Sequence, residues 1–319
     1  MLAQTRPAVG AVSVSAEQPA AALPLRMACV AATAAVALSW SAAPLAFVSG
    51  VYSIGFAHYL LALRYSAGQL RQISQAPLQW VSLAGLILLA IAFYQLDIPL
   101  VIYFGVHHAL NEAYARRGGG DPGQIARLGA PAAILHGLAY VAMLGFNPRY
   151  VGVDPAWLWG GLAVATGLYV YALLQLRPET GTTRLLEVCA PEISAAMMVG
   201  LSLLVRLTFL QIVLYHFLLW AVLPVPRIRQ RRGSALVQYL GLSAATIAAA
   251  MLLSPVGPPS IRLSSNAFTQ QFFLWSYIHI TLSFGLSEAH PAWIVRLCRG
   301  ARRSVDLPTI RIGRCDSTP

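Results

Sequence analysis

Two apolar runs joined by a short turn occupy residues 78–116, which read LQWVSLAGLILLAIAFYQLDIPLVIYFGVHHALNEAYAR. Each run approaches the length of about 20 apolar residues that an α-helix needs to cross the hydrocarbon core of a bilayer. Asp97 and Pro99 stand between the runs, and this pair is typical of a helix N-cap followed by proline in the first turn. The stretch therefore predicts two consecutive membrane helices joined by a tight turn.

The composition of the whole chain has the same character. Of its 319 residues, 57% are hydrophobic and only 10% are charged, and the mean hydropathy is +0.64. Soluble domains carry about 25% charged residues, so this chain has too few polar side chains to cover a water-facing surface. We exclude a soluble enzyme, a disordered chain and a nucleic-acid-binding domain. The sequence predicts an all-α, polytopic integral membrane bundle.

Apolar runs of this kind predict about ten transmembrane helices. They lie at residues 26–42, 45–66, 78–96, 99–116, 128–147, 156–176, 186–204, 206–225, 234–254 and 268–287. Two longer stretches, 26–66 and 186–225, would each also fit one long helix. Pro44 favours a break in the first stretch, and Asp154 with Pro155 predicts another capped helix start.

The arginines decide between the two counts. The chain has 22 basic residues, all of them Arg, and a net charge of +11. Ten spans place 19 arginines on one side of the membrane and only Arg149, Arg206 and Arg262 on the other. Eight spans would divide them 13 to 8 and leave Arg206 within the bilayer. The positive-inside rule therefore favours ten spans with both termini in the cytoplasm, in a bacterial-type inner or plasma membrane.

The two ends of the chain differ from its middle. Residues 1–24 predict a flexible tail without the features of a signal peptide, residues 25–290 the transmembrane domain, and residues 291–319 a basic cytoplasmic tail that lies beside anionic lipid head groups. Cys29, Cys189, Cys298 and Cys315 show no CxxC spacing. A disulfide framework or a zinc site is therefore not expected.

Six of the seven histidines fall inside predicted spans. These are His58, His107, His108, His136, His216 and His279, whereas His290 lies in the tail. Each of the six lies eight or nine residues from the cytoplasmic end of its span, which is about 12–14 Å at 1.5 Å per residue. Because successive spans run in opposite directions, the agreement predicts a single layer of imidazoles near the middle of the bilayer.

An acidic residue accompanies this layer. His108 and Glu112 are four residues apart and share a helix face, and His107 and Asn111 share the next face. Glu192 is a secondary acidic candidate. Many histidines with one or two carboxylates and no thiolate cluster favour non-haem iron, which would activate O₂ against an apolar substrate from the bilayer. The predicted metal ligands are His58, His107, His108, Glu112, His136, His216 and His279.

Three alternatives remain open at this stage. Each histidine could serve only an interhelical hydrogen bond, paired histidines could ligate a haem for electron transfer, or His and Glu could line the path of a transporter. The HxxxH, HxxHH and HExxH motifs of other membrane or zinc enzymes do not occur, and neither does an Asp-rich prenyl-diphosphate motif. No residue is therefore assigned a catalytic role.

The overall plan resembles that of the Brp/Blh-type carotene-cleaving membrane proteins. These are multi-span proteins with intramembrane histidines thought to hold iron, so the resemblance implies a similar bundle and an iron-dependent reaction on an isoprenoid. That family carries a His-Gly pair followed by Asp. Here His136 and Gly137 are followed by Leu138, Ala139 and Tyr140. The resemblance therefore transfers no catalytic residue.

Overall fold

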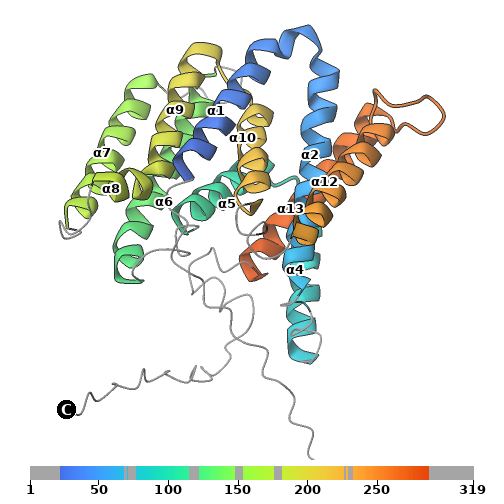
Figure 1. Cartoon of the computed structure of the whole chain (residues 1–319), viewed down its shortest axis with the longest axis horizontal. Coiled ribbons are helices and arrows are strands. Elements are labelled where there is room, and N and C mark those ends of the chain that lie inside the picture. Colours follow the sequence, from blue (N-terminus) through green and yellow to red (C-terminus); the bar gives the residue numbers. More distant parts are fainter. Residues whose placement is uncertain are drawn as a thin grey trace, which may run out of the picture.

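The structure is a computed structural model of the chain and consists of packed α-helices (Figure 1). It describes residues 22–67, 70, 77–114, 122–147, 154–175, 182–225, 228 and 233–286. Within these ranges there is no β-strand. The predicted all-α fold class is confirmed.

The main helices follow the predicted apolar runs. They are α1 (Ala22–Ser39), the short 3-10 helix η1 (Trp40–Ala42), α2 (Pro44–Tyr65), α4 (Pro77–Gln95), α5 (Leu100–Tyr114), α6 (Pro122–Gly145), α7 (Pro155–Leu174), α8 (Thr182–Val188), α9 (Ala190–Val205), α10 (Phe209–Val222), α12 (Gly233–Leu253) and α13 (Ser265–Leu286). Each predicted run contains a helix, and the run 186–204 is divided at Cys189 into α8 and α9.

Five helical stretches among the described residues are long and apolar enough to cross a membrane. They are Leu23–Ala42, Pro44–Arg64, Arg127–Gly145, Pro155–Leu174 and Gly233–Leu253. Shorter apolar helices occupy Trp80–Gln95, Ala190–Val205 and Phe209–Val222. An all-helical chain with several membrane-crossing helices is therefore the architecture that length and composition support.

Neither ambiguous stretch forms one long helix. In the first, η1 ends α1, and Pro44 occupies the first turn of α2 as predicted. In the second, Arg206 takes a left-handed conformation (φ 51°) that ends α9. The side-chain amide of Asn147 donates hydrogen bonds to the carbonyls of Arg206 and Leu207 at 3.0 and 3.2 Å. These bonds hold the turn between α9 and α10 against the end of α6.

The two predicted Asp-Pro helix starts differ in the structure. Asp154 caps α7, because its carboxylate accepts a hydrogen bond from the Ala156 amide at 2.8 Å. Asp97 instead adopts a left-handed conformation (φ 52°) just after α4, and the next amide, that of Ile98, bonds back to the carbonyl of Phe93 at 3.1 Å. Asp97 therefore ends α4 and does not cap the next helix. A left-handed residue at a helix end lets the following amides donate hydrogen bonds to the last carbonyls of the helix.

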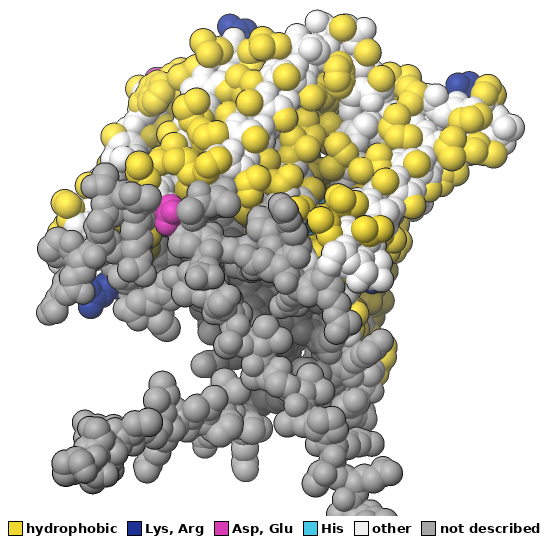
Figure 2. All heavy atoms as spheres, in the orientation of Figure 1, with side chains coloured by type: hydrophobic (Ala, Val, Ile, Leu, Met, Phe, Trp, Pro, Cys, Tyr) yellow, Lys and Arg dark blue, Asp and Glu magenta, His cyan; other side chains and the backbone are white. Residues whose placement is uncertain are grey.

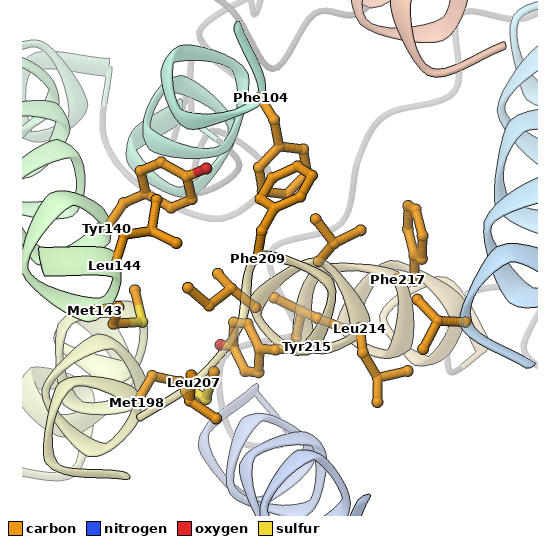
Figure 3. Packing of buried hydrophobic residues seen from close by; sticks show 14 of the residues in the cluster. Phe104, Tyr140, Met143, Leu144, Met198, Leu207, Phe209, Leu214, Tyr215 and Phe217 are labelled. Carbon is orange, nitrogen blue, oxygen red and sulfur yellow. The ribbon is translucent and has the colours of Figure 1, made fainter. Parts of the chain in front are cut away.

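Helix α10 lies at the centre of the bundle. It is buried along most of its length and packs against α1 and α2, and α1 also packs against α9. Figure 3 shows the apolar side chains of α10 reaching toward neighbouring helices, with Phe209 directed at Phe104 of α5. Because neighbouring helices surround α10, a polar side chain on α10 contacts another helix and not the outer surface of the bundle.

Helices α7 and α12 lie at the periphery. Large apolar side chains of these helices are exposed, among them Trp157 (79%), Leu174 (75%) and Val237 (71%). Apolar side chains cover most of the described surface visible in Figure 2. An exposed surface of this composition is suited to contact with lipid chains.

Several predictions fall outside the described residues. These are most of the tail 1–24, His290, the basic tail 291–319, and the arginines Arg227, Arg229, Arg231 and Arg232.

Candidate functional site

Five histidines from four helices meet around His216 of α10. The ring centroid of His216 lies 5.5 Å from that of His58 on α2, and 5.4 and 5.6 Å from those of His107 and His108 on α5. His279 of α13 lies 4.7 Å from His58 and 5.6 Å from His107. We call these five side chains the histidine cluster. It brings together residues separated by up to 221 positions along the chain.

Ring nitrogens of the cluster lie in contact in two pairs. Nε2 of His58 is 3.2 Å from Nε2 of His279, and Nδ1 of His108 is 3.4 Å from Nδ1 of His216. Within each pair, a neutral ring can donate its N–H to the bare nitrogen of the other ring. His107, His108 and His216 are buried. The other two members, His58 and His279, are partly buried.

His107 is fixed from both sides. Its Nε2 lies 3.0 Å from the side-chain amide of Asn111, one turn along α5, and its Nδ1 lies 3.0 Å from the hydroxyl of Ser283 on α13. His107 and Asn111 therefore share a helix face, as predicted. Ser283 was not anticipated, because its contact depends on how α13 packs against α5.

His136 lies in a second polar group. Its Nε2 is 3.2 Å from Oε1 of Glu192 on α9, and the hydroxyl of Tyr169 on α7 donates to Oε2 of the same carboxylate at 2.9 Å. The predicted layer of six histidines therefore divides into the cluster of five and this group on α6, α7 and α9. Glu192, the secondary candidate, is the acid of the second group.

Glu112 forms a buried ion pair with Arg26. Nη1 of Arg26 donates to Oε2 of Glu112 at 2.7 Å, and it also lies 3.2 Å from the hydroxyl of Tyr215 and 3.3 Å from that of Ser194. Oε1 of Glu112 is buried and makes no hydrogen bond to any described residue.

Arg26 is a charged residue of this site that the sequence did not reveal. Its place near the start of α1 is explained equally well by the charge bias of membrane loops, so the sequence did not distinguish it from other arginines. In the structure its side chain is only 5% exposed. The signal that could have found it is its position within an apolar helix, where an arginine requires an acidic partner.

The cluster as it stands has no metal-ligating geometry. Within the part of the chain that the structure describes, no three His, Cys, Asp or Glu side chains are arranged so that they could hold one ion. The rings pack against one another instead of pointing their nitrogens at a common centre. A metal would therefore need some of the imidazoles to rotate.

A small apolar cavity adjoins the cluster. Three of the five histidines line it, together with side chains of α2, α5, α10 and α13. Searches of protein-family models, curated proteins and solved structures found no match to this chain.

Proposed function

We propose that this protein is a membrane-embedded metalloenzyme in which intramembrane histidines ligate non-haem iron. It would act as an oxidoreductase of the oxygenase type on a lipid or isoprenoid that reaches the site from the bilayer. The observation that carries the proposal is the meeting of five imidazoles from four helices in one cluster.

Polar groups within a membrane are costly. Ionisable side chains in membrane helices are rare and mark functional sites, because each must find a partner away from water. A single interhelical hydrogen bond needs only two such side chains. A cluster of five imidazoles has more polar side chains than an interhelical hydrogen bond requires. Imidazole is also the protein ligand shared by iron, copper, nickel and zinc.

The proposed ligands come from the histidine cluster. They are His58, His107, His108, His216 and His279. Glu112 and His136 are given supporting roles, since they lie outside the cluster and pair with Arg26 and Glu192 respectively. Glu112 lies one turn from His108 on α5, where a carboxylate can orient a ligating imidazole.

The proposal includes the membrane arrangement. All ten predicted runs would cross the bilayer of a bacterial-type inner membrane, with both termini in the cytoplasm. Support comes from the 19 to 3 division of the arginines and from the helix that occupies each run.

Elemental analysis of detergent-purified protein tests the iron site. We expect roughly stoichiometric iron in the parent chain and a loss of most of it in His216→Ala, because His216 contacts three other members of the cluster. His290→Ala is the matched control, since His290 lies in the predicted tail, and it should keep its iron. A parent chain that binds no iron under anaerobic reconstitution would refute the proposal. A Soret band after haem supplementation would instead favour a haem protein.

A second candidate function is a proton path. The nitrogen contacts between His58 and His279 and between His108 and His216 favour it, because hydrogen-bonded imidazoles can pass a proton from ring to ring. Proton flux into liposomes containing metal-free protein measures this activity. Flux that disappears in His216→Ala and persists in His290→Ala would favour the path over the iron enzyme.

A further inference from the structure

The loop that connects α12 to α13 carries apolar side chains on its surface. Figure 1 shows this loop extending away from the other helices. Val256 and Ile261 are 42% and 49% exposed, and Leu263 is exposed as well. The last two residues of α12, Leu252 and Leu253, continue the same exposed apolar surface. We call these five side chains the apolar tip.

Internal hydrogen bonds hold the loop in shape. The amide of Leu263 donates to the carbonyl of Leu253 at 2.8 Å, which closes the loop across its base. The amide of Gly257 donates to the carbonyl of Ser254 at 2.9 Å and forms a turn within it. Three of the residues at 254–264 are proline, whose ring restricts the backbone further. A loop held in this way presents the apolar tip to a partner at a small cost in conformational entropy.

The loop lies where the boundary of a bilayer is expected. The stretch Gly233–Leu253 of α12 is long and apolar enough to cross a membrane, and its 21 residues extend about 30 Å at 1.5 Å per residue. The residues after Leu253 therefore reach the level of the lipid head groups. In Figure 2 apolar side chains and a basic group lie together at this projecting end.

Arg262 is the charged residue of the loop, and its side chain is exposed. Among the described residues its guanidinium meets one acceptor, the carbonyl of Pro255, to which Nη1 donates at 3.4 Å. The loop contains no Asp or Glu. Arginine binds phosphate strongly, because its planar N–H groups match the phosphate oxygens. A cation among apolar side chains therefore fits the level at which lipid phosphates border the hydrocarbon.

We propose that the α12–α13 loop is a phospholipid-binding element of the protein. The apolar tip enters the edge of the hydrocarbon, and the guanidinium of Arg262 binds a head-group phosphate while staying within reach of water. The partner is the phospholipid of the leaflet on that side, which is the external leaflet in the proposed membrane arrangement. The inference rests on that arrangement and is independent of the iron site.

Fluorescence quenching in phosphatidylcholine nanodiscs tests the contact. The dye NBD is attached to Ile261→Cys and quenched either by phospholipids with a nitroxide near the head-group end of the acyl chain or by iodide in the water. We expect quenching by the lipid nitroxide and protection from iodide. Leu240→Cys, exposed on α12, is the lipid control, and Gln175→Cys, exposed at the end of α7, is the aqueous control. The parent chain gives the background from its native cysteines.

Substitution of Arg262 tests the phosphate contact. In Arg262→Glu a carboxylate would face the lipid phosphates and be repelled by them. We therefore expect the labelled Ile261→Cys to lose most of its lipid quenching and to gain quenching by iodide, whereas Arg262→Lys keeps the charge and the lipid quenching. Arg206→Glu, exposed at the turn between α9 and α10, is the matched control and should leave the signal unchanged. Full lipid quenching in Arg262→Glu would overturn the inference.

The two helix controls separate this inference from the proposed membrane arrangement. Suppose that iodide alone quenches Ile261→Cys while lipid quenches Leu240→Cys. The loop contact would then be wrong, and α12 would remain a membrane span. Lipid quenching at Ile261→Cys without lipid quenching at Leu240→Cys would keep the loop contact and refute α12 as a span.

Discussion

Arg26 is the residue whose removal should destabilise the protein most clearly. Its guanidinium neutralises the buried carboxylate of Glu112 at 2.7 Å. In Arg26→Met that carboxylate loses its cation, and breaking a buried pair from one side costs about 3–5 kcal/mol. The double variant Arg26→Met with Glu112→Gln removes the isolated charge and should regain most of the loss. Thermal unfolding of the detergent-purified variants measures both effects.

Arg64→Met provides the control for this prediction. Arg64 is exposed at the end of α2 and donates to Gln238 at 3.2 Å, so its replacement should change stability by less than about 0.5 kcal/mol. If Arg26→Met unfolds at the same temperature as Arg64→Met, the ion pair contributes nothing to stability and the argument fails.

At the scale of single residues, the sequence predicted the histidines better than their partners. A histidine within an apolar run can be recognised by its position, and five of the six do meet. The partners of Glu112 and His136 could not be recognised in this way. Arg26 is 86 positions from Glu112, and Glu192 is 56 from His136. The rotation of each helix about its own axis selects such partners, and packing against neighbouring helices sets that rotation.

At the scale of elements, Asn147 should be the main support of the turn between α9 and α10. Its amide donates to two carbonyls that the end of α9 leaves unpaired by the helix. In Asn147→Ala both carbonyls lose their donor, that of Leu207 at a buried site, and we expect a loss of about 1–3 kcal/mol. Asn266→Ala, at an exposed site at the start of α13, should cause no comparable change. Hydrogen exchange of residues 205–212 would show whether the loss is local to the turn. Equal stability of the two variants would contradict the prediction.

A short sequence motif also marks this turn, and the apolar runs alone do not show it. Gln211 follows Thr208 by three residues, the spacing of a capping box, and its side-chain oxygen accepts from the Thr208 amide at 2.8 Å. This local signal favours a helix start at Phe209. The left-handed Arg206 was not predictable in the same way, because Arg has no intrinsic preference for that conformation. The presence of each helix could therefore be predicted from the apolar runs. The breaks within long runs depend instead on local helix caps and on contacts from α6.

At the scale of the whole molecule, α12 offers the sharpest test of the membrane arrangement. It is one of the five helices that are long and apolar enough to cross a bilayer, and the predicted positions of Arg231 and Arg262 lie on opposite sides of it. The positive-inside rule places Arg231 in the cytoplasm and Arg262 outside. In intact cells a membrane-impermeant maleimide should label Arg262→Cys, and it should label Arg231→Cys only after permeabilisation. The parent chain, with its four native cysteines, gives the background.

Each result of this labelling has a definite structural meaning. Labelling of both variants from outside would show that α12 does not cross the membrane, and the ten-span arrangement would then be wrong. The reverse pattern would keep α12 as a span but turn the whole bundle over. The histidine cluster would then lie nearer the external surface, because its members were placed by their distance from the cytoplasmic ends of the spans. The expected pattern fixes α12 as a crossing helix and leaves the cluster slightly on the cytoplasmic side of the bilayer centre.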